Sequence, residues 1–179
     1  GTIKLNGTTI NTGQKSLAFF SDSNGKIEFT GSTTANIAGG TDANSRGTAF
    51  YYTGNNYSSF DQQAVSSWVS STFGTTLPNL TLNMASGSRL FIASDVEMNL
   101  SNTNATNLFG SSSPTIIGTD YKTFMLYLSR LKVNQSVNLD NSNDAYNQLE
   151  ISNSSIDNNN SNEISGSQSG QTAVAQENL

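Results

Sequence analysis

Apolar and polar residues alternate in short runs along this chain, and this period of two limits the fold more than any other feature. The alternation occurs in residues 27–29, 80–84, 96–100, 131–133, 137–139 and 149–151. Because successive side chains of a β-strand point to opposite faces, each run predicts a short strand with one buried face. Gly, Asn, Ser and Asp, which favour turns, fill nearly every gap. The chain is therefore expected to be all-β.

Many short strands can form either an antiparallel sandwich or a parallel solenoid, and two observations favour the solenoid. Strands this brief, separated by Asn and Gly corners, are typical of the turns of a coil. Residues 16–20 (SLAFF) and 47–52 (GTAFYY) also repeat a small-then-aromatic pattern. If one circuit separates them, Phe50 stacks over Phe19 at about 4.8 Å. We expect a right-handed parallel β-helix over residues 1–179, as a segment of a larger domain, with roughly six to eight layers.

The alternation changes to a helical period in residues 59–73. Apolar residues, including Trp68, recur at three- and four-residue spacing, and Gln and Ser occupy the other side. Ser59 with Gln62 has the form of a capping box, and Gly74 stands where a helix ends. We expect one short amphipathic α-helix, inserted in the solenoid or packed against it.

Two other stretches depart from regular alternation. Residues 101–119 predict either another short helix or a loop. From residue 141 onward the gaps become richer in Asn and Ser, but Ile156, Ile164 and Val174 still occur as single apolar anchors. We therefore expect the coil to continue through this region.

Charge and composition exclude several functions. The net charge is −5 and only eight scattered Lys and Arg are present, so no basic surface for nucleic acid is expected. The chain has no Cys, which rules out disulfides and thiolate chemistry. It has no run of about twenty apolar residues, so we expect no membrane-spanning segment.

The residues available for catalysis are few. Without His or Cys, the remaining enzyme hypothesis is a carboxylate pair acting on a polysaccharide. The candidate pairs are Asp140 with Asp144 and Asp42 with Asp61. Their neighbours are polar turn residues, which give no reason for a raised pKa. We therefore expect ordinary turn aspartates and no enzyme.

The segment that begins at Asp140 also does not match the pattern of a calcium-binding loop. Ala145 stands where the loop needs Gly, and Ile151 stands where it needs Glu. No phosphate-binding glycine motif is present either. We expect no metal and no cofactor.

Aromatic residues that follow Phe50 suggest a binding surface. Tyr52, Tyr57 and Trp68 are our candidate binding residues, because Tyr and Trp are enriched where proteins contact proteins or sugars. The alternative for Trp68 is that it lies on the apolar face of the helix and docks the helix onto the solenoid. Tyr57, in an Asn-Asn-Tyr-Ser loop, is the better candidate for an exposed contact.

Three segments give the chain a family resemblance: GTIKLNG at residues 1–7, VNQSVNL at 133–139 and ISGSQSGQTAVA at 164–175. With these phrases it resembles the passenger regions of the large outer-membrane autotransporter adhesins of fusobacteria. The resemblance implies type V secretion, a β-helix projecting from the outer membrane into the exterior, and virulence-related attachment to other bacteria or host cells. It assigns no ligand residue.

Three functional classes follow, in order of preference: a non-catalytic adhesin passenger, a polysaccharide-binding or polysaccharide-degrading β-helix, and a fibre-type structural solenoid. The expected partners are surface proteins or glycans of other bacteria or host cells. A trimeric fibre should expose apolar side chains, whereas the predicted strand exteriors carry Thr, Asn, Glu and Lys. We therefore expect a monomer.

Overall fold

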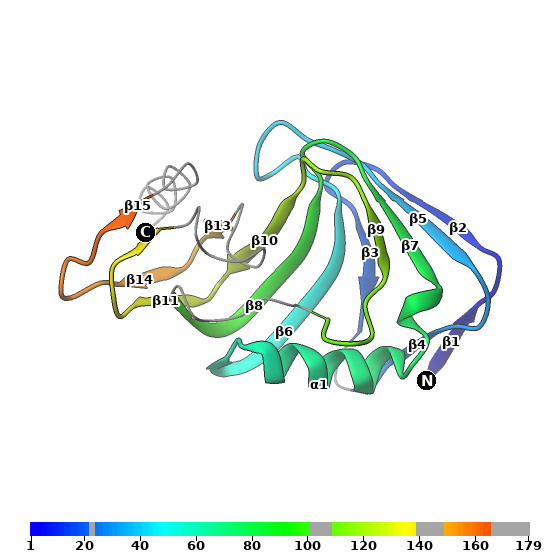
Figure 1. The fold of residues 1–179 in the computed structure, drawn as a ribbon, viewed down its shortest axis with the longest axis horizontal. Helices are drawn as coiled ribbons and strands as arrows, with labels where there is room; N and C mark the ends of the chain where they lie inside the picture. Colours follow the sequence, from blue (N-terminus) through cyan, green and yellow to red (C-terminus); the bar gives the residue numbers. More distant parts are fainter. Residues whose placement is uncertain (22–23, 101–108, 139–148, 166–179) are drawn as a thin grey trace.

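The computed structural model describes residues 1–21, 24–100, 109–138 and 149–165 (Figure 1). Within these ranges every pair of neighbouring strands is parallel. Parallel strands need a crossover, so no hairpin of a sandwich occurs between described strands. The expectation of an all-β, parallel fold with one short helix is confirmed.

The strands are short except for two that bend through a corner. In chain order they are β1 (Thr2–Leu5), β2 (Thr9–Thr12), β3 (Leu17–Phe20), β4 (Lys26–Phe29), β5 (Thr33–Ile37), β6 (Thr48–Ser59), β7 (Leu80–Met84), β8 (Arg89–Leu100), β9 (Thr115–Ile117), β10 (Lys122–Tyr127), β11 (Arg130–Val133), β12 (Val137–Asn138), β13 (Leu149–Ser152), β14 (Ser155–Asp157) and β15 (Ile164–Ser165). Every predicted alternating run forms a strand, although Leu139 lies outside the described residues.

The strands stack in successive layers. One sheet has the order β2-β5-β7-β9, and a larger one joins β3, β6, β8, β10 and β13, with β11 and β14 beside them. Two smaller sheets pair β1 with β4 and β12 with β15. Phe50 pairs in register with Phe19, as predicted, and their ring centroids are 5.5 Å apart.

Within the described part of the chain the stack is shallower than expected. Its deepest described column holds only β3, β6, β8, β10 and β13, fewer layers than the six to eight inferred from chain length. The reason is uneven spacing along the chain. The stretch of chain from Thr33 to its partner Leu80 is about twice as long as that from Thr2 to its partner Lys26. The longer stretch contains α1 and its flanking turns, which lie between β6 and β7.

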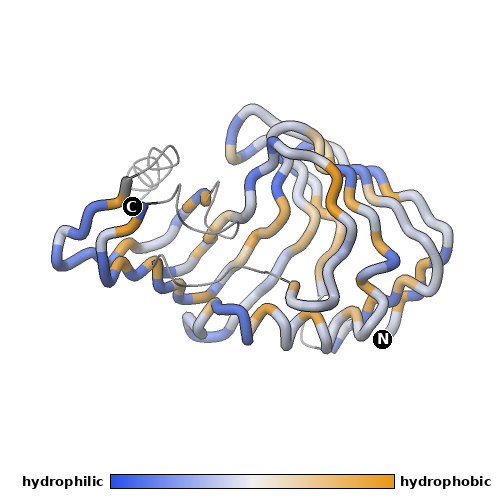
Figure 2. Tube along the Cα trace, in the orientation of Figure 1, coloured by the Kyte–Doolittle hydropathy of each residue, from blue (hydrophilic) through white to orange (hydrophobic). Residues whose placement is uncertain are grey.

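The core lies between the sheets and is rich in phenylalanine. Alternate residues of β5, β7 and the second half of β8 are buried, so the side chains of neighbouring layers cover one another. Figure 2 shows apolar positions in orange recurring from strand to strand. Phe50 is fully buried and contacts both Phe19 and Phe91, at 5.5 Å between centroids in each case. Burial of these rings drives the layers together.

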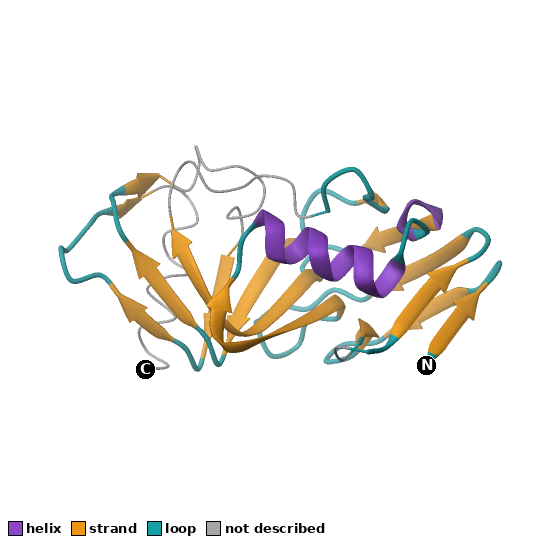
Figure 3. Ribbon diagram, turned by 90° about the horizontal axis from the view of Figure 1, so that it is seen from below, coloured by secondary structure: helices purple, strands orange, loops and turns teal. Residues whose placement is uncertain are grey.

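The helix α1 (Gln62–Phe73) lies along one side of the strands (Figure 3). Val65, Val69 and Phe73 are buried, and the Phe73 ring stacks on Phe29 of β4 at 5.9 Å. A short 3-10 helix, η1 (Leu77–Asn79), then leads into β7. The helix in the described residues is too short to cross a bilayer.

The predicted capping box at the start of the helix is wrong. Ser59 is the last residue of β6, and the helix begins at Gln62 after the N-cap Asp61. The Asp61 carboxylate accepts a hydrogen bond from the backbone N–H of Ala64 at 2.8 Å, which satisfies a free donor of the first turn. Gly74 ends the helix as predicted, with φ of 59° and its N–H bonded to Ser70.

A row of serine hydroxyls forms at the corner where β8 bends and where β10 gives way to β11. Ser129 Oγ accepts from the backbone N–H of Val96 at 3.2 Å, and Ser154 Oγ accepts from the N–H of Ser129 at 2.9 Å. The residue before each of these three positions has positive φ: Asp95 (53°), Leu128 (50°) and Asn153 (47°). The hydroxyls therefore supply partners for backbone donors that the bend removes from the sheet.

Candidate functional site

Tyr57 lies in a bulge of β6 that interrupts the pairing with β8. The register shifts between Thr53 and Ser58, and Asn56 and Tyr57 both have positive φ, of 48° and 54°. Asn tolerates such angles, but they are unfavourable for Tyr57, so something must hold this residue. The Asp95 carboxylate accepts the backbone N–H of both residues, each at 3.2 Å. The bulge is thus a defined feature of the fold.

This bulge displays the Tyr57 ring next to a cation. The ring is 39% exposed, and the Arg130 guanidinium carbon lies 3.7 Å from its centroid. A cation over an aromatic face is attracted electrostatically, by about 0.5–1 kcal/mol at an exposed site, which favours this arrangement of the two side chains. Arg130 begins β11 and is also exposed. Together they form an exposed surface of one ring and one guanidinium, which we call the Tyr57–Arg130 platform.

Tyr52 and Trp68 lie together, apart from this platform. Their rings are 5.8 Å apart, and Trp68 also contacts Phe73 at 5.3 Å and Phe91 at 5.5 Å. Both are only half-buried, but their main contacts are with the core, as in the docking alternative for Trp68. Phe50 is fully buried and so cannot belong to a surface. The predicted aromatic stretch is therefore divided between core and exterior.

Tyr52 has a shifted acidity that follows from this position. Burial raises the pKa of its phenol above 10.0, and the nearby Asp61 carboxylate raises that pKa further. Within the described residues, the buried indole N–H of Trp68 has no hydrogen-bond acceptor. Both polar groups are therefore partly shielded from water, which disfavours the charged form of the Tyr52 phenol.

A buried ionic cluster, which the sequence reasoning missed, ties distant parts of the chain together. The Glu150 carboxylate lies 3.1 Å from Arg46 Nε and 2.9 Å from Arg89 Nε, and all three side chains are at most 10% exposed. Arg46 also donates to the carbonyls of Gly40 and Gly87. The available signal was the charge at Arg89 and Glu150 within otherwise buried strands.

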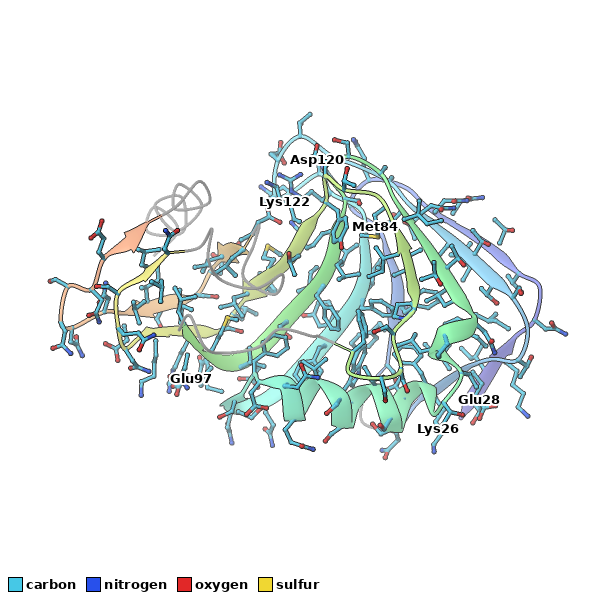
Figure 4. The ribbon with its side chains drawn as sticks, in the orientation of Figure 1. Lys26, Glu28, Met84, Glu97, Asp120 and Lys122 are labelled. Carbon is cyan, nitrogen blue, oxygen red and sulfur yellow. The ribbon has the colours of Figure 1, made fainter. Side chains whose placement is uncertain are left out.

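Lys122 lies near this cluster, close to Asp120 (Figure 4). Burial lowers the pKa of its ammonium group, and the positive charge of Arg46 lowers that pKa further. Asp120 accepts a hydrogen bond from Ser86 Oγ at 2.5 Å. This hydrogen bond links the turn before β8 to the turn before β10.

The candidate carboxylate pairs are not assembled in the described residues. Asp42 and Asp61 lie beyond opposite ends of β6, and each accepts a local backbone N–H, from Asn44 and Ala64 respectively. Asp140 and Asp144 lie outside the described residues. Among the described residues, no group of three or more carboxylates is arranged as a metal site. The geometry of Asp42 and Asp61 is that of turn and cap residues.

The comparisons with known proteins give no relative from which roles could be transferred. No family model, curated protein or solved structure matches this chain.

Proposed function

We propose that this chain is a segment of a right-handed parallel β-helix on the outside of a bacterium, and that it acts as a non-catalytic adhesin passenger. Three features support the β-helix: the parallel pairing of every described strand neighbour, the layered register, and the in-register stacking of Phe19 and Phe50. The type V secretion route and the outer-membrane location rest on the sequence resemblance.

The observation that carries the adhesive role is the Tyr57–Arg130 platform. Asp95 uses both carboxylate oxygens to hold the bulge, and Tyr57 keeps an unfavourable backbone angle to present its ring. A fold that only needed to stack layers would not require this exposed arrangement. Tyrosine and arginine, with tryptophan, are also enriched among the residues that contribute most of the binding energy in protein interfaces. The expected partner is a surface protein or glycan of another bacterium or a host cell.

The test is adhesion of beads coated with the protein to bacterial and host cells. Tyr57→Ala and Arg130→Ala should each lower the number of bound beads, with circular dichroism unchanged. Phe20→Ala is the matched control, because Phe20 is 52% exposed on β3 and is not part of the platform. Equal binding by wild type and both platform variants would refute this site, and binding by none of the proteins to any cell would refute the adhesive role.

A further inference from the structure

The outward face of the sheet β2-β5-β7-β9 carries a ladder of identical polar side chains. Asn36 Nδ2 donates to Asn11 Oδ1 at 2.8 Å, and Asn83 Nδ2 donates to Asn36 Oδ1 at 2.7 Å. The next residue in this register is Ile117, which is 55% exposed. A parallel row of threonines runs beside the ladder, at Thr9, Thr34, Thr81 and Thr115.

The asparagine ladder lines a shallow groove of about 480 Å³. Its other lining residues include Met84, labelled in Figure 4, together with Ile117 and Gly118. Gly118 is at φ of 131°, and a Cβ there would lie 2.4 Å from the Met84 carbonyl oxygen. Only glycine therefore allows the backbone at residue 118 to approach the backbone of Met84 this closely. The groove crosses four strands, a length of about 14 Å from the usual strand spacing.

The chemistry of the groove favours one kind of ligand. Among the described residues that line it, none is charged, so it offers nothing to a phosphate backbone or an acidic polymer. β5 and β7 are paired on both sides, which commits their backbone groups and leaves side chains as the means of recognition. An amide has two N–H donors and two acceptor lone pairs, and the ladder of Asn36 uses one of each.

We propose that this groove binds a neutral, linear glycan lying across the strands. The remaining amide donors and acceptors repeat at the strand spacing, which suits the repeated hydroxyls of a sugar chain. Ile117 supplies an exposed apolar contact for the C–H face of a sugar ring at the end of the ladder. This inference goes beyond the proposed adhesive platform, because it concerns a different sheet and a different ligand contact.

The test is titration of the protein with soluble neutral hexasaccharides, β-1,4-linked glucose and β-1,4-linked N-acetylglucosamine, followed by amide chemical shifts. At least one should shift groove amides, whereas a hexasaccharide of galacturonic acid should bind more weakly. Asn36→Ala should weaken binding about tenfold through lost hydrogen bonds. Ile117→Ala, at a position that is 55% exposed, should also weaken binding.

Asn134→Ala is the matched control, since Asn134 donates to Asn99 at 3.0 Å in a separate pair that lies outside the groove. It should bind like wild type, and so should Tyr57→Ala, which separates this site from the platform. The proposal is overturned if neither neutral probe shifts groove amides, if the acidic probe binds better, or if Asn36→Ala and Ile117→Ala bind like wild type. Self-association through this face, seen by sedimentation and removed by Ile117→Ala, would overturn it in favour of a second copy.

Discussion

Replacing Glu150 by glutamine should destabilise the protein far more than the loss of an ordinary surface ion pair. Glu150 is the shared anion of Arg46 and Arg89, and the three side chains are 9%, 10% and 3% exposed respectively. The carbonyl oxygen of a glutamine side chain at this position could still accept from one guanidinium, but the amide N–H₂ would face the other. One buried guanidinium would then lose its anionic partner and keep only neutral acceptors, the carbonyls of Gly40 and Gly87 for Arg46, or Thr48 Oγ1 and the Ala43 carbonyl for Arg89.

The expected magnitude follows from this burial. Removing one member of a buried, hydrogen-bonded ion pair costs about 3–5 kcal/mol, because the partner charge stays in a poorly solvated place. The matched control is Glu28→Gln, which breaks the Lys4–Glu28 pair. Those side chains are 67% and 36% exposed respectively and 3.9 Å apart, so the loss of this pair should cost at most about 1 kcal/mol.

Urea unfolding followed by circular dichroism measures both variants. With a slope of about 1–3 kcal/mol/M, Glu150→Gln should lower the midpoint by at least about 1 M, and Glu28→Gln by much less. Hydrogen exchange should locate the loss, with faster exchange in β13 and in residues 40–46 than in β4. Equal midpoints for the two variants would refute the reasoning, because they would mean that the buried cluster contributes no more than an exposed pair.

The remaining predictions concern the helix and the core. Asp61→Asn should keep the N-cap, since Asn caps as well as Asp, and should move the pKa of Tyr52 back toward 10.0. A pH titration of tyrosinate absorbance measures the change, with the absorbance of Tyr52→Phe subtracted to isolate Tyr52. An unmoved pKa would contradict the assigned cause. Because the raised folded pKa favours the neutral phenol, its contribution to stability is complete below pH 10.0 and is lost as pH rises through the folded pKa. Phe50→Ala should cost about 3–5 kcal/mol in urea unfolding, whereas Phe20→Ala, at a ring 52% exposed, should cost clearly less, and similar losses would contradict the assigned core.

The layered core was predictable because its signal is local and periodic. Alternation marks which side of each strand is buried, and an aromatic pair at matching places, such as Phe19 and Phe50, fixes which strands lie over one another. The helix was predictable for the same reason. Its exact start was not, because Ser59 and Asp61 are both good caps, and the pairing of β6 with β8 extends through Ser59.

The site was less predictable because its parts come from different layers. Nothing near Tyr57 in the sequence identifies Arg130 as its neighbour, since their proximity depends on the register of β8 with β6 and β11. The asparagine ladder did carry a signal. The triplet Thr-x-Asn occurs at residues 9–11, 34–36 and 81–83, and stacking these strands in register produces the ladder directly.

The buried ionic cluster bears on how the last layers stay attached. The middle layers share stacked phenylalanine rings, whereas β14 and β15 contribute Ile156 and Ile164, which are only partly buried. A layer with little apolar burial gains little from the hydrophobic effect. Glu150 stands between the buried Leu149 and Ile151 of β13, and it adds charge-assisted hydrogen bonds to Arg46 and Arg89 to the apolar contacts of this strand. The cluster should therefore matter most for the local stability of the final layers, which is why exchange in β13 is the sharper readout of Glu150→Gln.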